Sequence, residues 1–207
     1  MPIDFFASPC NQPNCISQQQ PSRCLVNVNM AQFGVSDANA NARQPAVIVF
    51  QGNPNDFNVF NANNRPVVYK AIDYCVIIYR TSNYDLNNDN RDPAAFSSDS
   101  VPDLRNQLIK RCEGFLLFDT NILFFEIKTG ETGRWLADAR EKFEETILSF
   151  KEHHQNLNLN ILPPIISNKT YIQNSGYRIH QNYNFQKQIL MDKIGLDFEL
   201  TDNFIIP

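Results

Sequence analysis

The sequence predicts a mixed α/β domain with a central sheet flanked by helices, and three observations support this fold class. The chain has 207 residues, of which 43% are hydrophobic, enough for one sizeable core. Two nearly continuous apolar runs, at 115–118 and 122–127, predict a strand hairpin that is covered on both faces. Residues 134–153 then repeat apolar side chains at helical spacing. A hairpin followed directly by an amphipathic helix indicates an α/β core.

Composition and charge exclude several classes of protein. A formal net charge of -4 is unlike that of a protein that coats nucleic acid, although one local basic face remains possible. No apolar run approaches the roughly 18 residues of a membrane span. The first residues lack the basic and apolar segments of a secretory signal. We therefore expect a cytoplasmic protein that does not enter the membrane and whose five cysteines are reduced.

Residues 1–45 are rich in Asn, Gln, Pro and Ser, which predicts a loop-rich N-terminal extension. Residues 46–207 are then a single α/β domain, with its core at 100–150. Within the extension, residues 24–28 are expected to form a short strand. The three cysteines of the extension suggest zinc, but their spacing matches no common ligand pattern and no His is nearby, so we favour free thiols. They are Cys10, Cys15 and Cys24.

Runs rich in Val, Ile and aromatic residues predict further strands before the hairpin. They lie at 46–50, 57–60 and 66–80. The last run is expected to break near Ala71. Lys70 and Asp73 are expected to face solvent, and the alternative is that they lie near the site described below. Residues 81–100 carry several Asp but lack calcium-loop spacing, which predicts a solvated loop.

Three helices are predicted, two of them on either side of the hairpin. Residues 101–110 follow a capping Ser100 and carry an acid in their first turn. Residues 134–153 form the longest helix, and residues 184–194 form a third, which ends at Gly195. Between the last two, the prolines in 160–166 confine that apolar run to an edge or bulged strand. Residues 196–206 are expected to form a final hairpin or strand.

The hairpin places charged residues at its open end. If residues 120–121 form a two-residue turn, Phe115 lies opposite Glu126 and Glu113 lies opposite Lys128. Directly opposed side chains point to the same face of a sheet. Glu113, Glu126 and Lys128 are therefore expected to share one face.

Two neighbouring residues take other roles. Ile127 is expected to point to the opposite face, into the helix layer. Asp119 is separated from the partner of Glu126 by roughly 13 Å, at about 3.3 Å per residue. At that distance Asp119 and Glu126 cannot both be ligands of one metal ion, and a turn residue is the simpler interpretation for Asp119.

Two carboxylates and a lysine at a strand end suit a metal-dependent phosphodiester-cleaving site. Mg²⁺, or Mn²⁺ in its place, is held in proteins by one or two carboxylates and keeps several waters. Glu113 and Glu126 are the candidate metal ligands and catalytic acids, and Lys128 is the candidate catalytic lysine. The simpler interpretation is a Glu–Lys pair on the solvent face of a sheet.

The order acid, turn, apolar strand, Glu126-Ile127-Lys128 and helix resembles the PD-(D/E)XK nuclease superfamily, which includes restriction enzymes and Holliday-junction resolvases. The resemblance covers about residues 100–150 and implies a restriction-endonuclease-like core. The family usually has Asp as its first acid, where this chain has Glu113. Asp103 matches a further metal-binding acid on the preceding helix, with Asp99 a weaker match. Lys142 is similar in place to a Gln or Lys that some members carry on the following helix.

The resemblance implies a metal-dependent nuclease that hydrolyses phosphodiester bonds in DNA or RNA. The alternative is a catalytically inactive protein of the nuclease fold, which serves as a binding or partner subunit. A homodimer or another protein partner is possible in either case. Other polar residues are expected to be structural: His153 and His154 at the helix end, Cys112 in the core, and Trp135 in the core rather than on a nucleotide.

Overall fold

The computed structural model describes residues 4–8, 20, 24–37, 45–50, 56–76, 110–129, 134–175 and 182–207. Within these ranges the chain forms two sheets, one of seven strands and one of four, together with three helices. The predicted mixed α/β class is confirmed. The predicted helix at 101–110 and the loop at 81–100 lie outside the described residues.

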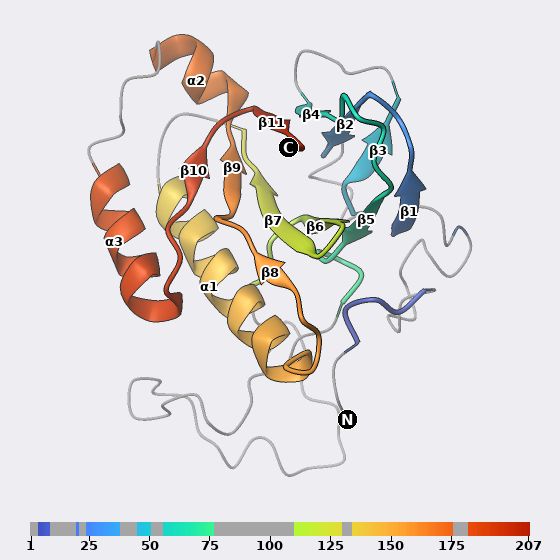
Figure 1. Cartoon of the computed structure of the whole chain (residues 1–207). Coiled ribbons are helices and arrows are strands. Elements are labelled where there is room, and N and C mark those ends of the chain that lie inside the picture. The colour runs from blue at the N-terminus through green and yellow to red at the C-terminus, as the bar shows by residue number, and fades with distance from the viewer. Residues whose placement is uncertain are drawn as a thin grey trace.

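The seven-stranded sheet contains the predicted hairpin at its centre (Figure 1). Its strands follow one another in space as β1 (Leu25–Val28), β5 (Val67–Ala71), β6 (Gly114–Phe118), β7 (Asn121–Ile127), β9 (Ile165–Ser167) and β10 (Glu199–Leu200), with β8 (Asn160–Ile161) also paired to β7. The pairs from β1 to β7 are antiparallel. The pairs of β7 with β8 and β9, and of β9 with β10, are parallel. The sheet is therefore mixed.

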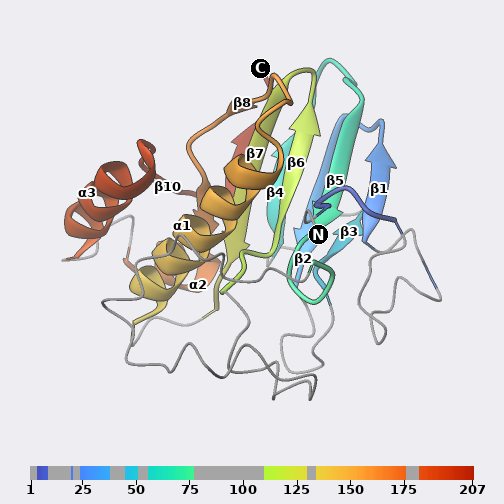
Figure 2. The ribbon, with the colours of Figure 1, turned by 90° about the horizontal axis from the view of Figure 1, so that it is seen from below.

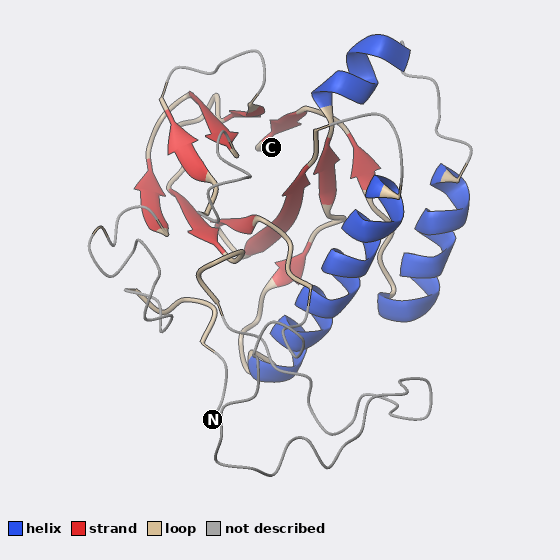
Figure 3. Cartoon of the chain, turned by 180° about the vertical axis from the view of Figure 1, so that it is seen from behind, coloured by secondary structure: helices blue, strands red, loops and turns tan. Residues whose placement is uncertain are grey.

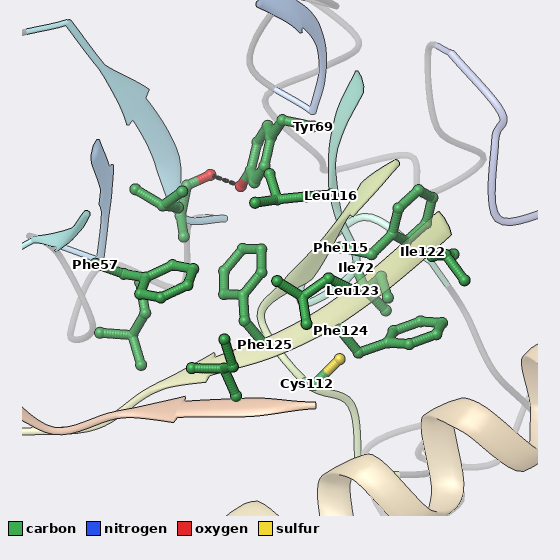
Figure 4. Packing of buried hydrophobic residues seen from close by; sticks show 14 of the residues in the cluster. Phe57, Tyr69, Ile72, Cys112, Phe115, Leu116, Ile122, Leu123, Phe124 and Phe125 are labelled. Carbon is green, nitrogen blue, oxygen red and sulfur yellow. Dashed lines mark hydrogen bonds between the residues drawn. The ribbon is translucent and has the colours of Figure 1, made fainter. Parts of the chain in front are cut away.

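The four-stranded sheet packs against one face of the larger sheet. Its order is β11 (Asn203–Ile205), β4 (Phe57–Phe60), β2 (Gln32–Ser36) and β3 (Val47–Val49). The two sheets meet through the ring of Phe125, whose centroid lies 5.4 Å from that of Phe57 and 6.2 Å from that of Tyr69 (Figure 4). The buried Tyr69 hydroxyl donates to the carbonyl of Ala46, so this polar group is satisfied inside the core.

The opposite face of the larger sheet is covered by α1 (Trp135–His153), and α3 (Tyr183–Ile194) lies on the outer side of α1 (Figures 2 and 3). The short helix α2 (Lys169–Ser175) follows β9. Phe150 of α1 packs against Phe124 and Phe115, with ring centroids 5.4 and 6.2 Å away. Among the described helices, none combines the length and apolarity needed to cross a membrane.

Local sequence patterns predicted these elements well. The strands at 46–50 and 57–60, the break at Ala71 and the helices at 134–153 and 184–194 are confirmed. Gly195 ends α3 with φ 75°, the left-handed conformation expected of a glycine at this position.

Each of the two strand predictions near the C-terminus holds in one of its two forms. The run with the prolines is bulged rather than at an edge: β8 and β9 both pair with β7, with one extra residue between them, and β9 lies between β7 and β10. Residues 196–206 form strands rather than a hairpin, because β10 pairs with β9 in the larger sheet and β11 pairs with β4 in the smaller one. Short strands take their partners from the rest of the fold, which their own sequence does not specify.

The N-terminal region contributes more to the fold than a loop-rich extension would. Its strands β1 and β2 belong to the larger and the smaller sheet, so a boundary at residue 45 does not divide the sheets. Phe5 is fully buried, and the Lys70 ammonium donates to the carbonyl of Ala7 at 2.6 Å. The expectation that Lys70 faces solvent was therefore wrong: it is fully buried, on the central strand β5 between β1 and β6.

The expectation of five reduced cysteines was also wrong. Cys24 and Cys75 form a disulfide with a Cα–Cα distance of 6.6 Å. Cys24 is therefore no zinc ligand, and Cys10 and Cys15 lie outside the described residues. Cys112 is a free, buried cysteine, as predicted for a core residue.

Candidate functional site

The hairpin turns one residue earlier than predicted. Residues 119–120 form the turn, so Gly114 pairs with Phe125 and the next step places Glu113 opposite Glu126. The predicted pairing of Glu113 with Lys128 was wrong by two residues. Asp119 explains the shift, because it adopts a φ of 51°, a left-handed conformation that Asp tolerates in tight turns. Side chains alternate with a period of two, so the shift leaves the acids on the predicted shared face.

Asp119 itself is a turn residue, as predicted. Its carboxylate is half exposed and pairs with the guanidinium of Arg65, at the opposite end of the hairpin from Glu113. It contributes nothing to the candidate site.

Glu126 lies at the centre of the candidate site and is fully buried. Its Oε1 atom accepts a hydrogen bond from Lys142 Nζ at 2.6 Å and lies 2.9 Å from Lys128 Nζ. Its Oε2 atom accepts the backbone N–H of Glu113 at 3.1 Å. One carboxylate oxygen therefore contacts two ammonium groups and the other accepts a backbone N–H. A buried carboxylate requires such partners.

Glu113 meets the same lysine from the neighbouring strand. Its Oε1 atom lies 3.7 Å from Lys142 Nζ, and its side chain is 6% exposed. Burial raises the pKa of Glu113 well above its ordinary value, and the nearby Glu126 carboxylate raises it further. Burial alone would lower the pKa of Lys142, but the Glu126 and Glu113 carboxylates outweigh that effect and raise it. The Lys142 ammonium thus lies between two carboxyl groups and compensates the charge of the nearer one, Glu126.

The prediction that Ile127 points into the helix layer was wrong. Glu126 pairs with Lys142 of α1, so the acidic face of β7 is the one that the helix covers. Phe124, two residues earlier, confirms this side by packing against Phe150 of α1. Ile127 therefore points away from the helix layer, on the side of Phe125. Hydrophobic alternation cannot tell which face the helix will cover, since both faces of β7 are buried.

Two further acids lie in the electrostatic surroundings of the site. Asp37 follows β2, and its pKa is raised to about 6 by burial and by the Glu126 and Asp73 carboxylates. Asp73 follows β5 and pairs with Arg111 at 3.3 Å. Its side chain is only 17% exposed, so the expectation that it faces solvent was wrong. Neither acid has a sequence motif, and Asp37 follows a strand of the smaller sheet, so it lies here because the two sheets pack together.

The remaining candidates divide clearly. Asp103 and Asp99 lie outside the described residues. Lys142, which the resemblance placed near the site, lies within hydrogen-bonding distance of Glu126. Trp135 is buried against Tyr171, as predicted for a core residue, and His153 Nδ1 lies 2.8 Å from the Ser149 carbonyl near the end of α1.

The donor set suits a hard divalent cation, since it consists of carboxylate oxygens, but it is small. Within the described residues, no group of three or more His, Cys, Asp or Glu side chains converges tightly enough to hold a metal ion. Glu113 and Glu126 could supply two ligands, which is as many as Mg²⁺ commonly takes from a protein. Lys142 occupies the space between them, so a cation would have to displace its ammonium.

No protein-family model matches this chain, and no curated protein or solved structure matches it significantly.

The raised pKa of Glu113 leads us to predict how the stability of the fold depends on pH. The folded state holds this proton more tightly than the unfolded chain, so ionising Glu113 destabilises the fold as pH rises above 4.5. We expect Glu113→Gln to be more stable than wild type at pH 7, with an advantage that shrinks toward pH 5. Urea denaturation at both values measures the difference. Glu199→Gln, at an exposed strand position, is the control and should show no such trend. A Glu113→Gln variant that is less stable than wild type at pH 7 contradicts the prediction.

Proposed function

We propose that this protein is a metal-dependent nuclease of the PD-(D/E)XK type, which hydrolyses phosphodiester bonds in nucleic acid. The observation that carries the proposal is the meeting of Glu113, Glu126 and Lys128 at one end of the β6–β7 hairpin. Supporting it, α1 follows the Glu126-Ile127-Lys128 strand directly, and β9 after the helix runs parallel to β7. This order is compatible with a restriction-endonuclease-like core.

In this proposal Glu113 and Glu126 would hold the cation, Mg²⁺ or Mn²⁺. When bound, such a cation lowers the pKa of a water and neutralises charge on the phosphate. Lys128 is 20% exposed at its side chain, more than either acid, and its ammonium can therefore turn from Glu126 toward a phosphate oxygen. Lys142 provides a second positive charge at the same place. Asp103, from the predicted helix at 101–110, remains the proposed further acid.

A second candidate function is a nuclease-fold protein that binds nucleic acid or a partner protein without cleaving it. The observation that favours it is the Lys142 ammonium, which already occupies the position between the two carboxyl groups. The full burial of Glu126 adds to this, because a substrate reaches it only if neighbouring side chains move. A homodimer or a subunit of a larger complex is compatible with either function.

The test is cleavage of plasmid DNA, single-stranded DNA and RNA in the presence of Mg²⁺ or Mn²⁺, with EDTA as a blank. Lys128→Met and Glu126→Gln are expected to lower the rate by about 10²- to 10³-fold, because they remove charge that acts on the transition state. The matched control is Lys187→Met. Lys187 lies on α3 and forms an ion pair with Asp197, and neither residue belongs to the site. This variant should cleave at the wild-type rate.

Measuring Mn²⁺ binding by isothermal titration calorimetry distinguishes the two functions. An enzyme should bind the cation through Glu113 and Glu126 and cleave at least one substrate. A folded wild-type protein that neither binds Mn²⁺ nor cleaves any of these nucleic acids contradicts the nuclease proposal. Retention of nucleic acid without cleavage would favour the second function.

A further inference from the structure

The disulfide joins two parts of the chain that are 51 residues apart. Cys24 lies directly before β1, and Cys75 lies at the end of the turn 73–75, which follows β5. Antiparallel pairing brings them together, since the N–H of Ala71 donates to the Cys24 carbonyl at 2.9 Å. Both cysteines are buried. The disulfide therefore ties the turn 73–75 to the sheet.

The same turn contacts the backbone of Glu113. The N–H groups of Ile72 and Asp73 both donate to the Glu113 carbonyl, at 2.8 and 3.3 Å. Arg111, two residues before Glu113, donates to Asp73 Oδ1 at 3.3 Å and to the Val76 carbonyl at 2.5 Å. The segment that carries Glu113 is thus hydrogen-bonded to the segment that the disulfide holds.

The turn itself has an unfavourable backbone conformation. Tyr74, at its centre, adopts a φ of 58°, which is rare for a bulky residue and costs conformational energy. Such a conformation persists only where the surrounding structure enforces it. The disulfide at Cys75 and the hydrogen bonds to Glu113 and Arg111 are the enforcing contacts.

We propose that the Cys24–Cys75 disulfide is a redox-controlled clamp, which keeps the turn 73–75 folded against Glu113 in the oxidised protein and releases it in the reduced protein. The proposal does not depend on metal binding or nuclease activity, because it concerns the position of a backbone segment. If the proposed function also holds, the clamp controls the placement of Glu113, one of the proposed metal ligands.

The redox step needs a dithiol reductant. One of its thiolates attacks a sulfur of the Cys24–Cys75 bond to form a mixed disulfide, and its second thiolate then closes a new disulfide within the reductant. Two electrons pass to the protein, and Cys24 and Cys75 each take up a proton to become thiols. Since both cysteines are buried, the reductant gains access only when the turn opens locally.

Hydrogen–deuterium exchange of the full chain, followed by mass spectrometry, tests the clamp. Peptides covering 69–76 report on Ile72 and Asp73, and peptides covering 121–127 report on β7 as an internal reference. Reduction is expected to raise exchange in the first set by roughly tenfold or more and to leave the second unchanged. The Cys24→Ser/Cys75→Ser variant should show the raised exchange without reductant and no further response to it.

Three results would overturn the proposal. In denatured, unreduced protein, Cys24 and Cys75 should both resist alkylation, because their sulfurs are joined; alkylation of both would mean that the disulfide does not form. Equal exchange at 69–76 in both redox states would mean that the turn needs no clamp. Reduction could also raise exchange in 121–127, or both the reduced wild type and the double variant could unfold. Either result would mean that the disulfide is a general stabilising cross-link and not a clamp on the turn.

Discussion

Replacing Lys142 with methionine is expected to lower the free energy of unfolding by about 3 kcal/mol at pH 7, because it removes the nearer of two ammonium groups beside the buried Glu126 carboxylate and leaves only Lys128 to compensate that charge. Lys142 lies 2.6 Å from a fully buried Glu126 oxygen and 3.7 Å from a Glu113 oxygen. Methionine keeps most of the apolar stem, so lost packing contributes little. Urea denaturation followed by circular dichroism measures the change.

A double-mutant cycle shows whether the loss comes from the paired carboxylates. Adding Glu113→Gln to Lys142→Met removes one of the two negative charges, and we expect the double variant to regain a substantial part of the lost stability. Lys187→Met is the matched control: its ion pair with Asp197 is 25% and 39% exposed, and such pairs contribute about 0–1 kcal/mol. A Lys142→Met variant no less stable than this control would contradict the description of the site.

Lys142→Met also bears on the proposed cation. The Lys142 ammonium and a divalent cation would compete for the same two carboxylates, since both bind between Glu113 and Glu126. If the protein binds Mn²⁺, the variant should bind it more tightly than wild type and should recover stability as Mn²⁺ is added. If Mn²⁺ does not change the free energy of unfolding of the variant, the result favours the catalytically inactive, binding function.

Replacing Gly114 with alanine is expected to destabilise the fold by about 3 kcal/mol or more, near the upper end for overpacking. A Cβ atom at this position would lie 2.5 Å from the Lys70 carbonyl oxygen and 3.2 Å from Phe125 Cζ. The first contact is with the backbone of β5, the neighbouring strand in the same sheet, and cannot move aside as a side-chain end can. Thermal and urea denaturation measure the loss.

Gly34→Ala is the control for Gly114→Ala. Its Cβ would meet Val49 Cγ2 at 2.8 Å and Asp56 Cβ at 3.1 Å, and both are side-chain atoms rather than backbone atoms of a neighbouring strand. We therefore expect a smaller loss than at Gly114. If the two substitutions cost the same, the close approach of β5 and β6 at Gly114 does not determine the cost.

The best sequence predictions concerned structures that depend on neighbouring residues. The apolar stripe of α1 and the left-handed glycine after α3 follow from spacings within a few residues, and both are observed. The hairpin was located correctly, but its register was shifted by two residues because Asp119 takes a left-handed conformation at the turn. The shared face of Glu113 and Glu126 survived that shift, since side-chain direction repeats every two residues.

The sequence alone thus established the mixed α/β class, the positions of the hairpin and helix α1, and the acids that lie at the open end of the hairpin. Long-range packing determined everything that depends on which segments meet. It placed α1 on the acidic face of β7, buried Lys70 beneath the N-terminal segment, and joined Cys24 to Cys75. It also brought Asp37 into the surroundings of Glu126. The periodicity of apolar residues along the sequence predicts which residues are buried. It does not predict which distant segment of the chain covers them.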